Sequence, residues 1–282
     1  MMAELVEKSR NNIFIGIIIK LGCWIALKLI DLRWEILSWL RIVGFAPSKY
    51  QKIKALKNKY EGQRCFIICT GPSLTLDDLE LLKDEYTFSM NSIMLFYEKT
   101  EFRPTFYGCI DQQVWLKLRN LIIEYDTPKM LTFVSNRQSR HDRLRNHWYE
   151  IPINVAYHTY DRYFKGKFWC NINDDIYKGV YDLYSVTHFL IQVAIYMGFK
   201  KIYLLGADCN FPKHGKTHFA DYGVSDTTID TARERNICGY KKLKEYCDSH
   251  DVKIYNATRG GTLDVFERVS LDEILEKSFY SK

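Results

Sequence analysis

Hydrophobic positions divide this chain into an N-terminal apolar stretch and a longer region in which short apolar runs alternate with amphipathic segments. Short buried runs predict strands, whereas apolar residues recurring every three or four positions predict helices. We expect strands at 64–69, 86–91, 105–111, 130–134, 201–208 and 253–256, and helices at 76–82, 113–124, 185–198, 233–250 and 271–277.

This alternation predicts an α/β fold, with a parallel sheet covered by helices on both faces. In such sheets a ligand lies beyond the carboxyl ends of the strands. The residues expected at those ends are Thr70, Gly71, Ser73, Asn91, Asp111, Ser185, Asp208 and Asn256. Their convergence on one edge is the main reason to expect a binding site there.

The stretch from Cys65 to Leu74 is an apolar run that stops at Gly71-Pro72-Ser73, where a helix follows. Gly71 lets the backbone come close to a ligand, Pro72 suits a helix start, and Ser73 can cap that helix. A helix start attracts phosphate. An ordinary strand–turn–helix corner without a ligand explains this stretch equally well, and one glycine makes neither a dinucleotide fingerprint nor a P-loop.

The N-terminal stretch at 13–45 is strongly apolar. It is interrupted by the charged residues Lys20, Lys28, Asp31, Arg33, Glu35 and Arg41. These charges argue against a membrane span, and no signal-peptide cleavage site follows. Tryptophans among basic residues favour a helix in the membrane interface. An amphipathic helical hairpin packed on the core or on a second subunit is the alternative.

Two regions follow from these patterns. Residues 1–60 form an amphipathic helical segment with a basic linker at 49–59, which can contact anionic lipid. Residues 61–282 form the catalytic domain, and the aromatic, irregular stretch at 148–180 predicts an insertion or lid within it.

Composition narrows the class of protein. The chain has 282 residues, 47% hydrophobic and 26% charged, which indicates a globular protein. The net charge of +6 suits an anionic substrate or a membrane surface, and we find no nucleic-acid-binding motif. Eight scattered cysteines without a Cys-x-x-Cys pair indicate reduced thiols and a cytoplasmic location.

The tract Arg137–Arg145 is typical of a solvated basic face, with acceptor or lipid binding as the alternative.

The loop after Asp208 carries Lys216, His218 and Tyr222. A histidine beside a carboxylate in a loop can act as a general base, and a lysine with a tyrosine can hold a leaving phosphate. Solvated loop side chains are the alternative. The pair Asp174-Asp175 is more typical of solvated or capping residues, so we expect no metal site.

The ordered motifs resemble two related families. They are Ile67–Leu74, Asn91, Tyr107–Asp111, Ser185-Val186-Thr187, and Gly206-Ala207-Asp208 with Gly215–His218. One family is the 6-hydroxymethylpterin diphosphokinase MptE-like family, whose domain also occurs in the motility-associated (Maf) flagellin glycosyltransferases. The other comprises bacterial sialyltransferases that use CMP-sialic acid. The resemblance covers roughly residues 62–270 and implies a Rossmann-like nucleotide-binding domain.

The resemblance also implies site roles. In the sialyltransferases the Gly-Pro-Ser turn, the asparagine after the second strand and the serine of the late helix lie at the nucleotide. Those roles fall on Gly71, Pro72, Ser73, Asn91 and Ser185. That family uses tyrosines and a histidine base without an essential metal, which points to Tyr222 and His218. Thr70 and Asp111 are further nucleotide-binding candidates, at positions where sialyltransferases commonly have asparagine. The Gly-Lys-Thr-His loop is closer to the pattern of the MptE-like and Maf proteins.

We therefore expect a cytoplasmic glycosyltransferase, bound peripherally to the inner face of the membrane, that builds bacterial surface glycan. Its donor would be a nucleotide-activated, CMP-linked acidic sugar, with no cofactor required. His218 would be the base in a direct displacement, and Lys216, Tyr222 and the Gly71–Ser73 amides would hold the leaving phosphate, with Asp208 nearby. The other partners are a glycan acceptor and, as an open possibility, a second copy of the chain.

Two alternatives belong to other classes. The first is an MptE-like diphosphokinase that moves pyrophosphate from ATP to a pterin alcohol, with Mg²⁺ on Asp111, Asp208 or both. The second is a non-catalytic scaffold that keeps the nucleotide-binding fold, because a fold alone does not fix a function.

Overall fold

The computed structural model describes residues 13–45, 49–138, 144–156, 168–211, 223 and 229–279. Its helices are α2 (Ile13–Ile42), η2 (Gln51–Leu56), α3 (Leu76–Leu81), η3 (Asn91–Phe96), α4 (Gln112–Glu124), α6 (Val186–Tyr196), η5 (Ile229–Thr231), α7 (Ala232–Asp248) and α8 (Leu271–Phe279). Its strands are β1 (Arg64–Ile68), β2 (Thr87–Met90), β3 (Phe106–Cys109), β4 (Leu131–Ser135), β5 (Tyr149–Ile151), β6 (Ile153–Asn154), β7 (Val180–Tyr181), β8 (Lys201–Leu205), β9 (Lys253–Asn256) and β10 (Glu267–Arg268).

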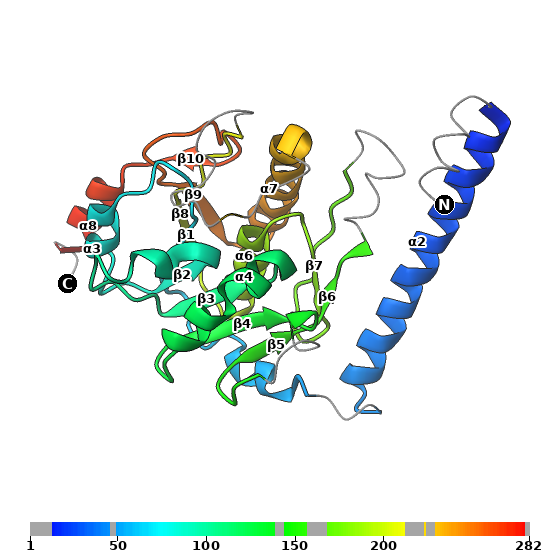
Figure 1. The fold of residues 1–282 in the computed structure, drawn as a ribbon, viewed down its shortest axis with the longest axis horizontal. Coiled ribbons are helices and arrows are strands. Elements are labelled where there is room, and N and C mark those ends of the chain that lie inside the picture. Colours follow the sequence, from blue (N-terminus) through cyan, green and yellow to red (C-terminus); the bar gives the residue numbers. More distant parts are fainter. Residues whose placement is uncertain are drawn as a thin grey trace.

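Eight strands form one sheet in the order β10-β9-β8-β1-β2-β3-β4-β5 (Figure 1). Each neighbouring pair is parallel. The last residue of β1, Ile68, pairs with Ser89 of β2 and Leu205 of β8, so these three strands end at nearly the same level. The expected parallel α/β sheet is confirmed, and its carboxyl ends share one edge.

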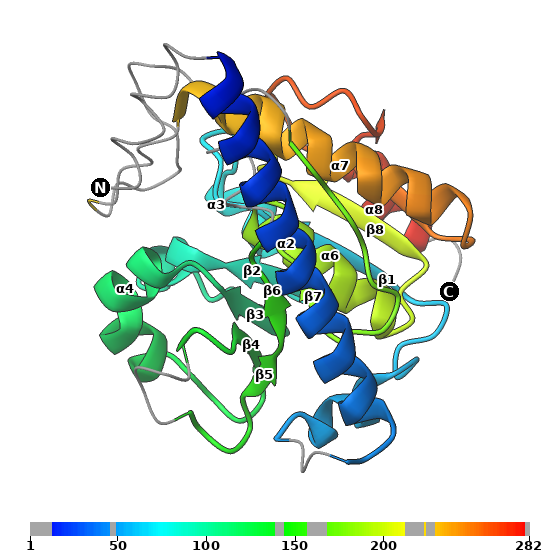
Figure 2. The same cartoon turned by 90° about the vertical axis from the view of Figure 1, so that its right-hand side faces the viewer.

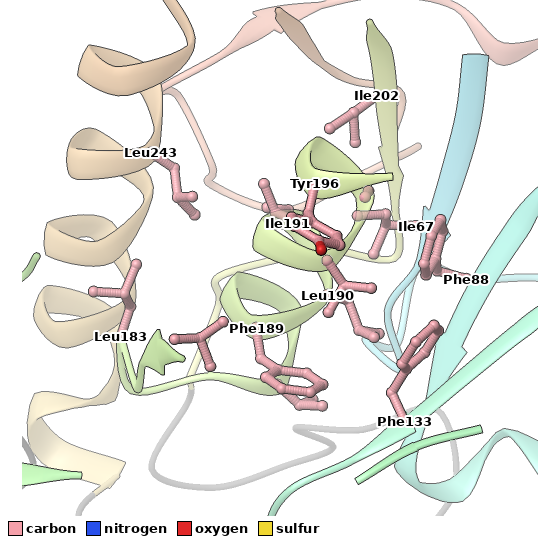
Figure 3. Close-up of a cluster of buried hydrophobic side chains, with 14 of the residues drawn as sticks. Ile67, Phe88, Phe133, Leu183, Phe189, Leu190, Ile191, Tyr196, Ile202 and Leu243 are labelled. Atoms are coloured by element: carbon pink, nitrogen blue, oxygen red, sulfur yellow. The ribbon is translucent and has the colours of Figure 1, made fainter. Parts of the chain in front are cut away.

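Alternate side chains of β1 enter two separate cores, because successive strand residues point to opposite faces. Cys65 and Ile67 pack in the cluster that includes α6 and α7, whereas Phe66 and Ile68 pack in the cluster that includes α3, α4 and α8. Figure 3 shows the first cluster, in which side chains of α6 meet Ile67, Phe88 and Phe133 of the sheet. The expected helices on both faces are confirmed.

The N-terminal apolar stretch forms one continuous helix, α2, rather than a hairpin. It lies alongside β6 and β7, at the outside of the molecule (Figures 1 and 2). In the part of the chain that the structure describes, no helix is both long and apolar enough to cross a membrane.

Two boundary expectations need correction. The stretch at 148–180 is not wholly an irregular insertion, because Tyr149–Ile151 forms strand β5 of the main sheet and Ile176 is fully buried. Part of the basic linker also belongs to the hydrophobic core, since Ile53 and Leu56 of η2 are buried in the cluster that includes α6 and α7. Both features are too short to produce a visible hydrophobic period. The division of the chain at residue 60 stays a prediction.

Candidate functional site

Strand β1 is the point at which the sheet order reverses, with β2 to β5 on one side and β8 to β10 on the other. Ligands of open parallel sheets bind at such a switch point. The loops after β1 and β8 meet here: the N–H of Gly71 donates to the carbonyl of Gly206 over 3.0 Å, and the hydroxyl of Ser73 donates to Oδ2 of Asp208 over 2.9 Å. Two of the expected strand-end motifs are therefore in direct contact.

A third loop, after β9, closes around Asp208. The N–H of Thr262 donates to the Asp208 carbonyl over 2.7 Å. Gly261 has a φ of +77°, and a Cβ there would collide with the Asp208 backbone. Sequence analysis missed this loop, although the Gly260-Gly261 pair after a strand is a recognisable turn signal. Asp208, only 7% exposed, is therefore the residue on which three loops converge.

Contacts within the chain leave no room for a side chain at Gly71. A Cβ at this position would collide with the Asp208 carboxylate and the Gly206 carbonyl. The backbone N–H groups of this turn are also engaged, because Ser73 N donates to Asp208 and Leu74 N donates to the Gly71 carbonyl. In this structure the Gly71 and Ser73 amides therefore bond the chain itself, and their role in holding a leaving phosphate stays a prediction. Pro72 has no N–H and lies exposed at the turn.

Helix α3 does not begin at Ser73. Its N-cap is Thr75, whose hydroxyl accepts from Asp78 N while the Asp78 carboxylate accepts from Thr75 N. This six-residue helix has two aspartates, Asp77 and Asp78, in its first turn. Asp78 is compensated by Arg259, whose Nε donates to Oδ1 over 2.7 Å, but the capping box already bonds the Thr75 and Asp78 amides, so the expected phosphate attraction at this helix start is not supported.

Backbone strain gathers at the carboxyl edge. Three of the five non-glycine residues with positive φ in the described chain are Asn91 (+48°), Tyr184 (+74°) and Cys209 (+49°). The first is itself an expected site residue, and the others adjoin Ser185 and Asp208. Each such residue costs about 1–2 kcal/mol, and such strain is typical of binding and catalytic sites.

Asn91 combines this strain with an unsatisfied polar atom. Its side-chain Oδ1 is buried and has no hydrogen-bond partner among the described residues, while its backbone carbonyl accepts from the Tyr107 hydroxyl over 2.8 Å. The tyrosine therefore fixes the loop, and the asparagine amide keeps a buried acceptor oxygen at the end of β2 that no described residue satisfies. A ligand donor would satisfy this oxygen.

The first turn of α6 lies against the ends of β1 and β2. The hydroxyl of Thr187 is 3.4 Å from Cys69 Sγ and 3.5 Å from Met90 Sδ. Ser185 caps this helix, because its hydroxyl accepts from Thr187 N over 3.2 Å. The structure thus brings Ser185 close to the strand ends that precede Thr70 and Asn91, as expected from the parallel topology.

Asp111 lies further along the same edge, at the end of β3. Its Oδ1 accepts from the N–H groups of Gln113 and Val114 and caps α4, and its side chain is exposed. Within the described residues, no three histidine, cysteine or acidic side chains gather in a way that could hold a metal ion. Asn256, by contrast, is structural, since its amide bonds Leu263 O and Thr258 N.

The buried thiols at this edge stay protonated. Burial raises the pKa of both Cys69 and Cys209 to about 12, so neither supplies a thiolate at neutral pH. The buried imidazole of His188 is neutral for the same reason, because burial lowers its pKa to about 4. Lys216, His218 and Tyr222, the expected chemical groups, lie outside the described residues.

Comparisons with known proteins agree with the expected resemblance. The family model "6-hydroxymethylpterin diphosphokinase MptE-like" matches residues 44–214, well over half of the chain. No curated protein sequence matches significantly. A solved structure, the MAf glycosyltransferase from Magnetospirillum magneticum AMB-1, is similar with a TM-score of 0.46 and 14% identity. The similarity covers 81% of this chain but only 40% of that chain. On the strength of the family match, the chain belongs to the 6-hydroxymethylpterin diphosphokinase MptE-like family.

Proposed function

We propose that this protein is a glycosyltransferase that takes a sugar from a nucleotide-activated donor, a CMP-linked acidic sugar, and adds it to a bacterial surface glycan. The observation that carries the proposal is Asn91. Its strained backbone and its buried, unsatisfied Oδ1 lie at the strand end where the sialyltransferase resemblance implies a nucleotide-holding asparagine. Membership of a nucleotide-using family and the position beside the switch point support the same reading.

The proposed reaction is a direct displacement at the anomeric carbon of the donor. The acceptor hydroxyl gives its proton to His218 and forms the new C–O bond, while the bond from the sugar to the nucleotide phosphate breaks. Lys216 and Tyr222 stabilise the negative charge on the departing phosphate. Asp208 is a positioning residue, because it holds the Gly-Pro-Ser turn in place. Asn91 and Ser185 contact the nucleotide.

The alternative is an MptE-like diphosphokinase. Its Mg²⁺ would be held by Asp111, Asp208 or both, together with the substrate phosphates, which is a common arrangement for this ion. One oxygen of each carboxylate already accepts hydrogen bonds from the chain. Each aspartate therefore offers Mg²⁺ chiefly its second oxygen. The third candidate is the non-catalytic scaffold.

The proposal includes a cytoplasmic location at the inner face of the membrane, where a nucleotide-sugar donor and a growing glycan acceptor meet. All eight cysteines are free thiols in the structure, which fits a reducing compartment. A second copy of the chain is the other candidate partner.

A thermal-shift titration with CMP, CDP, UDP, GDP and ATP, each with and without Mg²⁺, tests the proposal. A ligand that binds only the native state raises the melting temperature by mass action. We expect stabilisation by CMP without metal, and its loss in Asn91→Gly. Stabilisation by ATP only with Mg²⁺ would favour the diphosphokinase, and no response to any nucleotide would favour the scaffold. Full turnover by His218→Ala with an identified donor would reject His218 as the base.

A further inference from the structure

Among the described residues, helix α2 contacts the rest of the protein through one side. Asn154 Nδ2 donates to Asp31 Oδ1, and the Tyr181 hydroxyl donates to Glu35 Oε1, both over 3.0 Å. Nearly two turns further on, Arg41 donates to the carbonyls of Tyr177 and Lys178. This inward side includes both acidic residues of the helix, and the chain itself supplies hydrogen bonds to their carboxylates.

The inward side is also closely packed. Leu27 is 8% exposed, and Trp34 lies so close to Gly179 that a Cβ at Gly179 would collide with its ring. Lys28 Nζ lies 4.0 Å from the ring centre of Trp169. All of these partners belong to residues 154–181, so α2 is anchored on the β6–β7 side of the molecule (Figure 2).

The opposite side of α2, which we call the outward face, is apolar along the helix. We define it by Ile18, Ile25, Leu29, Leu32, Ile36 and Trp39, each at least 45% exposed. With 3.6 residues per turn, the exposed large apolar side chains of α2 cover roughly two thirds of its circumference over a length of about 45 Å. Soluble monomers rarely expose an apolar surface of this extent, which marks an interaction site.

The charges around this face are basic. Arg33 is exposed beside it and Lys20 is exposed near the start of the helix, on the same side as Leu27, whereas the only acidic residues of the helix, Asp31 and Glu35, accept hydrogen bonds on the inward side. Interfacial helices have this distribution, with lysine, arginine and tryptophan flanking an immersed apolar surface. Basic side chains near a bilayer are attracted to anionic headgroups.

A second copy of the chain fits this surface less well. The seven-residue spacing of Ile18, Ile25, Leu32 and Trp39 is compatible with a helix pair, but such a pair buries only a narrow stripe and prefers opposite charges beside it. Exposed Ile30, Leu37 and Ile42 would also remain in water.

We infer that the outward face of α2 binds the surface of an anionic phospholipid bilayer, with the helix lying parallel to that surface. This inference deepens the location given under the proposed function, but it does not depend on the transfer chemistry.

Vesicle co-sedimentation of the full chain tests the inference. We expect binding to phosphatidylethanolamine vesicles with roughly one third phosphatidylglycerol, and weaker binding to pure phosphatidylcholine or at high salt. The double variant Leu29→Glu/Leu32→Glu should reduce binding at least about tenfold, because it places two charges in the immersed surface. The matched control is Leu81→Glu/Leu116→Glu, two leucines of the catalytic domain that are 50% and 51% exposed. The control should bind as the unmodified protein does.

Brominated phospholipids provide a second readout that is local to α2. They should quench the fluorescence of the unmodified protein through Trp24 and Trp39, and Trp24→Phe/Trp39→Phe should lose this quenching while it retains vesicle binding. Absence of vesicle binding, equal binding to phosphatidylcholine, or a dimer that Leu29→Glu/Leu32→Glu dissociates would each overturn the inference. The nucleotide thermal shift should be unchanged in Leu29→Glu/Leu32→Glu, which separates failure of this inference from failure of the proposed function.

Discussion

The hydroxyl of Ser73 donates a 2.9 Å hydrogen bond to Oδ2 of Asp208, a residue 135 positions later in the chain. This contact joins the loop after β1 to the loop after β8, on neighbouring strands at the switch point of the sheet. Because the Asp208 side chain is nearly buried, its carboxylate oxygens depend on these loops for hydrogen bonds. The contact thus couples the stability of the fold to the shape of the candidate site.

Ser73→Ala removes the hydroxyl donor and should lower the free energy of unfolding by about 1–3 kcal/mol, the usual cost of an unsatisfied buried charge partner. The measurement is urea unfolding of Ser73→Ala, Asp208→Asn and the double variant. The double-mutant cycle should give a coupling energy of about 1 kcal/mol or more. A coupling energy near zero would show that the two side chains do not interact in solution.

Gly71→Ala should destabilise the protein by about 1–3 kcal/mol, because its methyl group has to displace the Asp208 carboxylate and the Gly206 carbonyl. The matched control is Gly22→Ala on α2, where a Cβ meets nothing within 4 Å. Alanine has the higher helix propensity, so this control should be neutral or slightly stabilising. Equal stability of the two variants by urea unfolding would contradict the close approach at Gly71.

Much of this site follows from sequence, because parallel topology places strand ends together. Strand β9 was expected at 253–256 and is found there, and the Gly-Ala-Asp sequence marks the end of β8. The two-residue strands β6, β7 and β10 were not expected, since two residues show no alternation.

The hydrogen bonds of the Gly-Pro-Ser turn could not be predicted from the local sequence. A glycine before a helix permits a close ligand, but here the group that comes close is Asp208, whose proximity depends on the whole sheet. The same limit applies to Asn91. Its position at a strand end was expected, whereas its left-handed backbone and unsatisfied oxygen are visible only in three dimensions.

The variant Asn91→Gly distinguishes an effect on nucleotide binding from an effect on the stability of the fold. Glycine adopts positive φ without strain, so this variant should keep its stability or gain up to about 1 kcal/mol, while Asn91→Ala should lose about 1 kcal/mol. Both variants should lose the thermal shift with CMP, since both lack the amide. Asn58, with a φ of +54° in the turn before β1, is the matched control. Asn58→Gly should keep the full CMP shift, and equal loss in both glycine variants would count against a ligand role for Asn91.

Cys238 should react with iodoacetamide at a lower pH than an ordinary thiol. The Sγ atoms of Cys170 and Cys238 are 3.1 Å apart, and the S–H of Cys170 donates to Cys238. This hydrogen bond stabilises the thiolate and lowers the pKa of Cys238 below that of an ordinary thiol. Peptide mass spectrometry should show half-maximal alkylation of Cys238 at a lower pH in the unmodified protein than in Cys170→Ala, where the hydrogen bond is lost. Cys247, whose pKa burial raises to about 12, is the unreactive internal control.

His188 should make the protein less stable as the pH falls from 6.5 towards 4. Its side chain is fully buried on α6, its Nδ1 bonds the Leu183 carbonyl, and burial lowers its pKa from 6.5 to about 4. Between these two values the unfolded chain binds a proton that the folded protein does not. The stabilisation is therefore complete above pH 6.5 and is lost progressively down to about pH 4, by up to about 1.4 kcal/mol per pH unit.

Urea unfolding at several pH values, compared with His188→Gln, isolates this contribution. The carboxylates and the other histidines are common to both proteins, so the difference in slope reports position 188. The variant should be less stable at pH 7.5, because glutamine fits the site between Tyr240 and Leu183 differently, but its stability should fall less steeply between pH 6.5 and 4. Parallel slopes in that range would mean that His188 takes up its proton in the folded protein as readily as in the unfolded chain, and would place water or a movable segment beside the imidazole.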